Sequence, residues 1–288
     1  LGSILFRFHD SHTAYFSKLA SGIERGCSQG TVGGPAIFSI LTNDASSSRS
    51  TCKIIKYSDD MSCVIPCAKD PSSYDKMLLK AEFEDFSQWA TKKNLQINEE
   101  KTKQIRFSLN PDPESRCSCT NLSGIQNVTE IKILGVTFQK NGLFAKHVKN
   151  VLAHARSLLY LLKDMHHHQM PINEVNRLFE SVILSRIRYA ISVYGCDDAA
   201  LRKVDRFLEK CRDKNYCSER FSAYEILEKE DRRLLQQVMN NENHPLRPYI
   251  LSHKKQHSFN TRTQYFGVKP KTKTRFFLRT FCNRILTL

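Results

Sequence analysis

Residues 53–66 run Lys53-Ile54-Ile55-Lys56-Tyr57-Ser58-Asp59-Asp60-Met61-Ser62-Cys63-Val64-Ile65-Pro66. The segments on either side of Ser58-Asp59-Asp60 are rich in the β-branched and aromatic residues that favour strands. Two short strands joined by a tight polar turn form a β-hairpin. The sequence therefore predicts a hairpin that carries two adjacent carboxylates at its tip.

Paired carboxylates on a rigid turn suit a divalent metal ion, which prefers hard oxygen ligands and keeps open positions for phosphate and water. Neighbouring strand residues point to opposite faces. One of Asp59 and Asp60 is then able to bind a metal directly while the other orients it. Adjacent aspartates are also common in ordinary polar turns, so the pair alone leaves both interpretations open.

Outward from the hairpin, the first half of the chain mixes strands and helices. Residues 22–35 form a glycine-rich loop that enters a helix near Pro35. Helical spacing of apolar residues predicts a helix over 73–93, and alternation predicts strands over 102–109 and 131–138. Residues 1–20 are expected to form a pair of strands.

Beyond Phe144 the apolar period becomes helical and remains so. A first helix is expected from residue 144, and a second from Pro171 to about Tyr189. Asp197 or Asp198 is expected to cap a third helix, and Ser222 a fourth. The tract His166-His167-His168 is expected in a solvated loop.

The charge is strongly positive, with 44 Lys+Arg against 29 Asp+Glu, a net +15. Residues 243–288 contain ten of these cations, no acid, and several interleaved aromatics. Cations that hold phosphates beside rings that stack on bases are typical of nucleic-acid grooves. The alternative is a small aromatic core with a solvated basic face. The candidate nucleic-acid contacts are Lys254, Lys255, Arg262, Lys271, Lys273 and Arg275. The ten cysteines form no convincing zinc pattern, so we expect free thiols.

Four motifs in order add specificity to the hairpin. They are Arg25-Gly26-Cys27-Ser28-Gln29-Gly30-Thr31, Tyr57-Ser58-Asp59-Asp60, Leu95-Gln96-Ile97-Asn98 with Lys101-Thr102-Lys103, and Leu134-Gly135-Val136. This set resembles motifs B, C, D and E of the reverse transcriptases of non-long-terminal-repeat (LINE-type) retrotransposons. The resemblance covers residues 22–194, and the tail only by position.

The resemblance implies roles for single residues. Asp59 would be the principal metal ligand, with Asp60 as its supporting carboxylate and Mg²⁺ or Mn²⁺ as the ion. Substrate-binding residues would be Gln29, Gly30, Tyr57 and Lys101, where Lys101 would act on the leaving pyrophosphate. The primer grip, which aims the primer 3′-hydroxyl, would be Leu134, Gly135 and Val136. For Lys101 the alternative is a solvated lysine.

One part of the family pattern is absent. Motif A, which supplies the other metal-binding aspartate, should lie well upstream of Gln29, and Asp10 is too close to that loop to be a good substitute. The chain begins with Leu1 and is expected to start inside a longer reading frame that adds palm, fingers and an endonuclease. We therefore expect a polymerase piece that is inactive alone, or, as the alternative, a non-catalytic nucleic-acid-binding remnant or domesticated module.

The expected fold is α+β. A partial palm, an antiparallel sheet with helices, would span 1–143, a helical thumb 144–212 and a basic helical region 213–288. The expected partners are an RNA template, a DNA primer and deoxynucleoside triphosphates, but no membrane, because no apolar run is long enough to cross one. The expected location is intracellular, in the nucleus and cytoplasm as a ribonucleoprotein.

Overall fold

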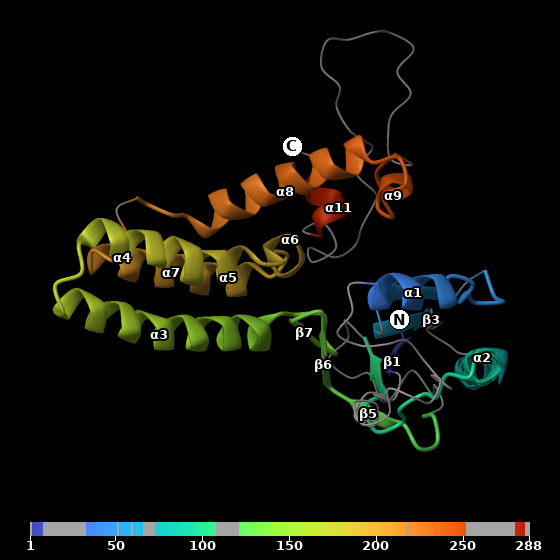
Figure 1. The fold of residues 1–288 in the computed structure, drawn as a ribbon. Helices are drawn as coiled ribbons and strands as arrows, with labels where there is room; N and C mark the ends of the chain where they lie inside the picture. Colours follow the sequence, from blue (N-terminus) through green and yellow to red (C-terminus); the bar gives the residue numbers. More distant parts are fainter. Residues whose placement is uncertain are drawn as a thin grey trace, which may run out of the picture. The chain divides into compact units, whose positions relative to one another are not determined.

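The computed structural model describes residues 2–7, 33–50, 52–58, 60–65, 73–107, 121–217, 219–251 and 280–285. These residues are mixed helix and sheet, an α+β fold (Figure 1). They divide into two compact units. The first comprises 1–133 with 138–142, and the second comprises 134–137 with 143–288.

A five-stranded sheet with the order β2-β3-β1-β4-β5 organises the first unit. Its strands are β1 (Gly2–Arg7), β2 (Lys53–Tyr57), β3 (Asp60–Ile65), β4 (Lys103–Arg106) and β5 (Gln126–Val128). The predicted hairpin is confirmed as β2 and β3, which pair antiparallel. The sheet is antiparallel except for the parallel pair β4–β5.

Of the strand pair expected within residues 1–20, the structure describes one strand, β1. This strand lies inside the sheet, with β3 on one edge and β4 on the other. A strand has only two hydrogen-bonding edges, so β1 has none left for a partner among its near neighbours. Residues 8–20 lie outside the described part of the chain.

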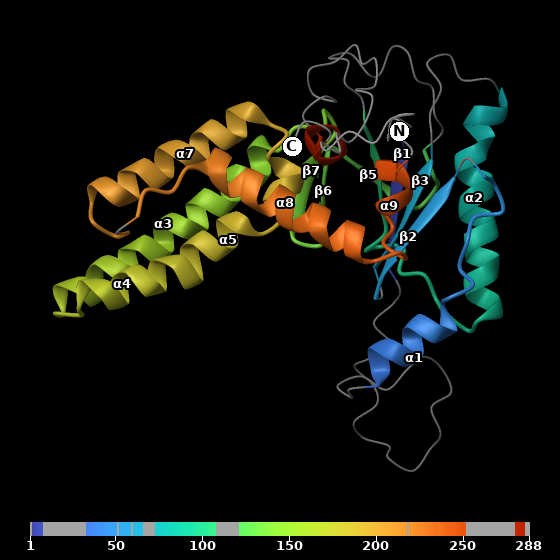
Figure 2. The same cartoon turned by 90° about the horizontal axis from the view of Figure 1, so that it is seen from above.

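Helix α1 (Gly34–Leu41) precedes the hairpin and helix α2 (Ser73–Lys92) follows it. Burial along β3 alternates, and Met61, Cys63 and Ile65 are its buried positions. These side chains share a core with Leu79 and Phe86 of α2. The alternation means that α2 covers one face of the sheet, along which Figure 2 shows it running.

The strand predicted over 131–138 is corrected to two strands, β6 (Glu130–Ile133) and β7 (Val136–Gln139), that pair with each other. The break falls at Leu134 and Gly135, both with positive φ. Positive φ at both central residues is the requirement of a two-residue hairpin turn. The glycine that supplies one of these angles is the signal that the strand prediction overlooked.

Among the described residues beyond 144, all regular elements of the second unit are helices. They are α3 (Ala145–His167), α4 (Ile172–Leu178), the π-helical η1 (Phe179–Leu184), α5 (Ser185–Arg188), α6 (Ile191–Tyr194), α7 (Asp198–Asp213), α8 (Ala223–Asn240), α9 (Arg247–Leu251) and α11 (Phe281–Arg284). The helix predicted over 171–189 is confirmed as the continuous run α4–η1–α5. The histidine tract is corrected, because His166 and His167 belong to the last turn of α3.

The helix caps follow the predicted residues. Asp197 caps α7 by accepting a hydrogen bond from the Ala200 amide, and its other oxygen accepts from the amide of Phe144 just before α3. Ser222 caps α8 by accepting from the Tyr224 amide. Asp197 therefore ties the beginnings of two helices together. None of the described helices is long and apolar enough to cross a membrane.

Candidate active site

The hairpin of β2 and β3 presents its polar tip on a fixed register. Tyr57 pairs with Asp60, which leaves only positions 58 and 59 between the strands. Ser58 has a φ of 52°, in the left-handed region that hairpin turns require. Asp59 itself lies outside the described residues. The register nevertheless fixes where the chain must turn.

Asp60 lies on the sheet face opposite to the α2 core. It alternates with Met61, which is fully buried, and is itself half-buried. Residues directly opposite in an antiparallel pair share a face, so Tyr57, which is 64% exposed, lies on the Asp60 face. An oxygen ligand on this accessible face fits the donor chemistry that Mg²⁺ prefers.

Lys101 lies at the same end of the sheet as the hairpin tip. Strands β3 and β4 are both antiparallel to β1, so they run parallel to each other, and both begin at this end. Lys101 is exposed in the turn before β4. Its amide donates to Asn98 Oδ1 at 3.1 Å, and the Thr102 hydroxyl donates to the Asn98 carbonyl at 2.6 Å. The buried Asn98 thus shapes the turn that carries Lys101.

Strand β2 is tied to the end of α1 close to the hairpin turn, through Lys56. Lys56 Nζ lies 2.9 Å from the carbonyl oxygens of both Thr42 and Asn43. A cation suits these carbonyls, because the C-terminal end of a helix carries partial negative charge. Asp44 is next in the chain and bonds Lys93 at 2.9 Å, a hydrogen bond that lowers the pKa of its carboxyl.

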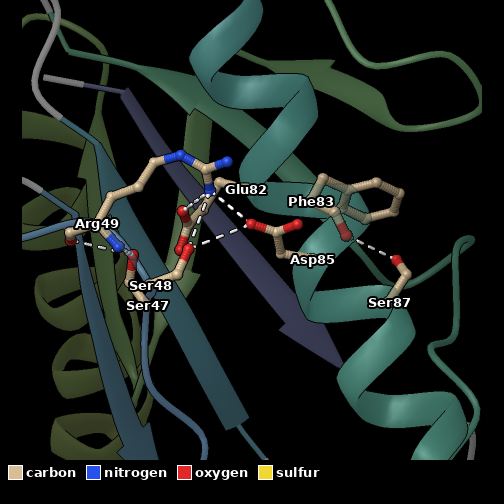
Figure 3. A network of polar contacts seen from close by, with 7 residues as sticks. All are labelled: Ser47, Ser48, Arg49, Glu82, Phe83, Asp85 and Ser87. Carbon is tan, nitrogen blue, oxygen red and sulfur yellow. Dashed lines mark hydrogen bonds and ion pairs between the residues drawn. The ribbon is translucent and has the colours of Figure 1, made fainter.

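A third tie holds the loop between α1 and β2 against α2 (Figure 3). Arg49 Nη1 donates to Glu82 Oε2 at 2.8 Å and to Asp85 Oδ2 at 2.7 Å, and Ser48 also donates to Asp85. These acids, Glu82 first, raise the pKa of the Arg49 guanidinium. Glu82 is only 2% exposed, so Arg49 pairs with a carboxylate that is shielded from solvent.

The thiol of Cys63, in β3, is buried in the core of the first unit. Burial, helped by the nearby Glu82 charge, raises the pKa of the Cys63 thiol to about 12. Metal coordination needs the thiolate, which this environment disfavours. Within the described ranges no group of three or more His, Cys, Asp or Glu side chains is arranged to hold a metal ion.

Leu134, Gly135 and Val136 form the second predicted cluster, at the turn between β6 and β7. Leu134 is 41% exposed, whereas Val136 is buried. The Leu134 carbonyl accepts a 2.6 Å hydrogen bond from the Tyr189 hydroxyl. This short segment therefore combines a buried apolar side chain, Val136, with an exposed turn just before it.

Residues 13–138 match the family described as reverse transcriptase (RNA-dependent DNA polymerase). The chain is 25% identical over 204 residues to "RNA-directed DNA polymerase from mobile element jockey" of Drosophila melanogaster, and 24% identical over 184 residues to the protein of that name from Drosophila funebris. Over these residues the chain is similar to reverse transcriptases, including those of a LINE-type, non-LTR mobile element. The two matches cover 65% and 60% of the chain.

The chain spans about a fifth of the length of these reverse transcriptase relatives, 21% and 20%. No solved structure matches it. The reverse transcriptase match ends at residue 138, within β7. Members of this family act with divalent metal ions on nucleic acid and nucleotide substrates.

Several predicted reverse transcriptase residues fall outside the described part of the chain. They are Gln29, Gly30, Asp59, Lys254, Lys255, Arg262, Lys271, Lys273 and Arg275, together with Asp10. Two other cations of the basic tail are described, and both are engaged inside the protein. Arg284 forms a two-pronged pair with the buried Asp231, at 2.7 and 2.9 Å, and Arg247 donates to the carbonyls of Val238 and Met239.

Sequence reasoning missed Tyr189, His147 and Lys56, which fasten the two clusters. The partners of Lys56 and Tyr189 lie 13 to 55 residues away, and the partner of His147 is Thr137 of β7. No local spacing rule connects such residues.

Proposed function

We propose that this chain carries the motif C hairpin, the motif D turn and the primer grip of an RNA-directed DNA polymerase. The observation that carries the proposal is the two-residue turn between Tyr57 and Asp60, on the accessible face of the sheet, in a chain of this family. The reaction is addition of deoxynucleotides to a DNA primer on an RNA template.

The metal ion would be Mg²⁺ or Mn²⁺. Asp59 and Asp60 would hold it through carboxylate oxygens, and the ion would offset the charge of the reacting phosphate. Lys101, at the same end of the sheet, bears the cation that meets the leaving pyrophosphate. Gln29 and Gly30 would bind the nucleotide, as the resemblance implies.

The helical second unit acts as the thumb, and α3 provides its nucleic-acid surface. Exposed cations line this helix, and its single acid is Asp164. Tyr160 is 74% exposed between them. The exposed cations are Lys146, Lys149, Arg156 and Lys163. Phosphate contacts by such side chains release counterions, so binding must weaken as salt rises.

Manganese binding tests the metal site. The chain is mixed with an RNA–DNA primer–template and a nucleotide, and bound Mn²⁺ is measured by electron paramagnetic resonance. Asp59→Asn should lose most of the bound ion. Asp213→Asn removes the same charge from an exposed site at the end of α7 and should retain it. Equal binding by both variants would exclude Asp59 as a ligand.

Salt dependence tests the α3 surface. Binding of the same hybrid is measured by fluorescence anisotropy at several salt concentrations. Replacing Lys149 and Arg156 by alanine should lower the slope of log affinity against log salt by about 1 for each lost phosphate contact. Lys229→Ala, on the exposed side of α8, is the control. An unchanged slope in the α3 variant would refute this surface.

A further inference from the structure

The turn between β6 and β7 has an unusual backbone. Leu134 has a φ of 46° and Gly135 a φ of 84°. Glycine adopts this region readily, but a leucine does so only when its surroundings compensate the strain. The turn needs contacts from elsewhere in the chain to keep this conformation.

Tyr189, at the end of α5, supplies such contacts. Its hydroxyl donates to the Leu134 carbonyl at 2.6 Å. A Cβ built on Gly135 would lie 3.3 Å from Tyr189 Cε1, so the phenol ring passes directly over the glycine. The ring and the hydroxyl therefore fix both central residues of the turn at once.

The far side of the turn is held by α3. The Thr137 amide donates to His147 Nδ1 at 3.3 Å, and the His147 ring is 4% exposed. That ring lies 5.1 Å from the ring of Tyr194, whose hydroxyl donates to the Ile187 carbonyl. Both sides of the turn thus connect to the segment 187–194.

The segment 187–194 is itself sharply shaped. Ala190 has a φ of 56° and separates α5 from α6. Ile187 and Ile191, on either side of it, are fully buried. Tyr189 is 56% exposed between them. The buried neighbours fix the backbone, so Tyr189 projects from a rigid base.

We propose that Tyr189 is a positioning residue that locks the turn of Leu134 and Gly135, and with it the primer 3′ end, to the helical unit. The inference rests on the proposed role of Leu134–Val136 as a primer grip. Tyr189 touches no reacting atom. It fixes the direction in which the turn presents its backbone, so loss of its hydroxyl should change primer placement rather than overall affinity.

Photocrosslinking of the primer terminus tests this. A DNA primer ending in 4-thiothymidine is annealed to RNA and irradiated with the full chain, and the crosslinked peptide is identified by mass spectrometry. In the wild type it should contain residues 134–136. Tyr189→Phe removes one hydrogen bond and should lower that yield about fivefold, with hybrid affinity unchanged. Tyr224→Phe, another exposed tyrosine of the second unit, should match the wild type.

Two results separate the inference from the proposed function. A wild-type crosslink outside residues 130–140 would refute the primer grip and, with it, the role of Tyr189. A correct wild-type crosslink that Tyr189→Phe leaves unchanged would refute the role of Tyr189 alone. Hydrogen exchange in the free chain gives an independent measurement. Amides of Gly135 and Val136 should exchange faster in Tyr189→Phe, and unchanged exchange would overturn the lock.

Discussion

Alternation along β3 gives adjacent residues opposite chemistry. Asp60 faces the accessible side, and Met61 and Cys63 face the core under α2. The sequence predicted this alternation because a strand has a period of two. It did not predict which side would be covered, since that depends on α2, which begins only at Ser73.

The buried thiol of Cys63 predicts a loss of stability at alkaline pH. Its pKa is raised to about 12 in the folded chain, against 9.0 for an ordinary thiol. The folded state therefore keeps its proton where the unfolded state loses it, so this contribution is complete below pH 9 and falls as pH rises toward 12. Cys63→Ser removes the titrating group and should flatten the decline.

Urea unfolding at several values from about pH 8 to about pH 10.5 measures this effect. The free energy of unfolding of the wild type should fall with pH by on the order of 1 kcal/mol per pH unit for each buried thiol. Cys211, whose pKa burial also raises to about 12, adds to the decline of the second unit. If the free energy of unfolding falls equally with pH in the wild type and in Cys63→Ser, the Cys63 thiol is not responsible for the decline.

At the scale of elements, ion pairs and hydrogen bonds made by long side chains fix the position of the hairpin. Three ion pairs or hydrogen-bond sets connect the loop 42–49 to β2 and α2. Of these, the pair between Arg49 and Glu82 is the one with a buried carboxylate (Figure 3). Removing one partner of such a pair leaves an uncompensated charge.

Arg49→Met should destabilise the first unit by about 3 kcal/mol, because Glu82 would remain buried without its cation. Lys80→Met breaks the exposed pair with Glu84 on the same helix and should cost less than about 0.5 kcal/mol. Urea unfolding monitored at Trp89 compares them. The double variant Arg49→Met with Glu82→Leu should recover much of the loss, and no recovery would show that packing, not charge, is responsible.

Local signals in the sequence predicted most of the elements, but not the ties. Caps at Asp197 and Ser222, the α2 spacing and the β2–β3 hairpin all depend on residues within one or two turns of each other. The π-helical turns of η1 have no such signal, because neither proline nor glycine marks them. The Tyr189–Leu134 bond joins residues far apart in sequence, so only the folded chain reveals it.

Across the whole chain, the proposed function makes the number of metal-binding carboxylates the limiting factor for activity. In the proposed site, motif C supplies Asp59 and Asp60, and the second carboxylate would come from motif A, which the sequence analysis does not find in these 288 residues. A polypeptide of these residues should therefore show no primer extension on poly(rA)/oligo(dT) with Mg²⁺ or Mn²⁺. Incorporation that disappears in Asp59→Asn would instead reveal another carboxylate within the chain, and Asp10 would be the first to replace.

The basic charge of the chain is divided between two uses. Arg284 and Arg247 neutralise or bond groups inside the second unit, whereas the cations of α3 are exposed. Net charge alone does not distinguish these two uses. They are distinguished by whether the group that the cation bonds is buried. The tail residues Lys254 to Arg275 remain predicted contacts for nucleic acid.

The central place of β1 has a consequence for how the protein is made. Leu5 pairs with Ser62 on one side and with Lys103 on the other. On the ribosome this strand emerges long before either neighbour, so it must wait for most of the first unit to be synthesised. Pairing across such sequence separations is slow and leaves an apolar strand exposed meanwhile. The nascent chain should depend on chaperones until β4 has left the exit tunnel.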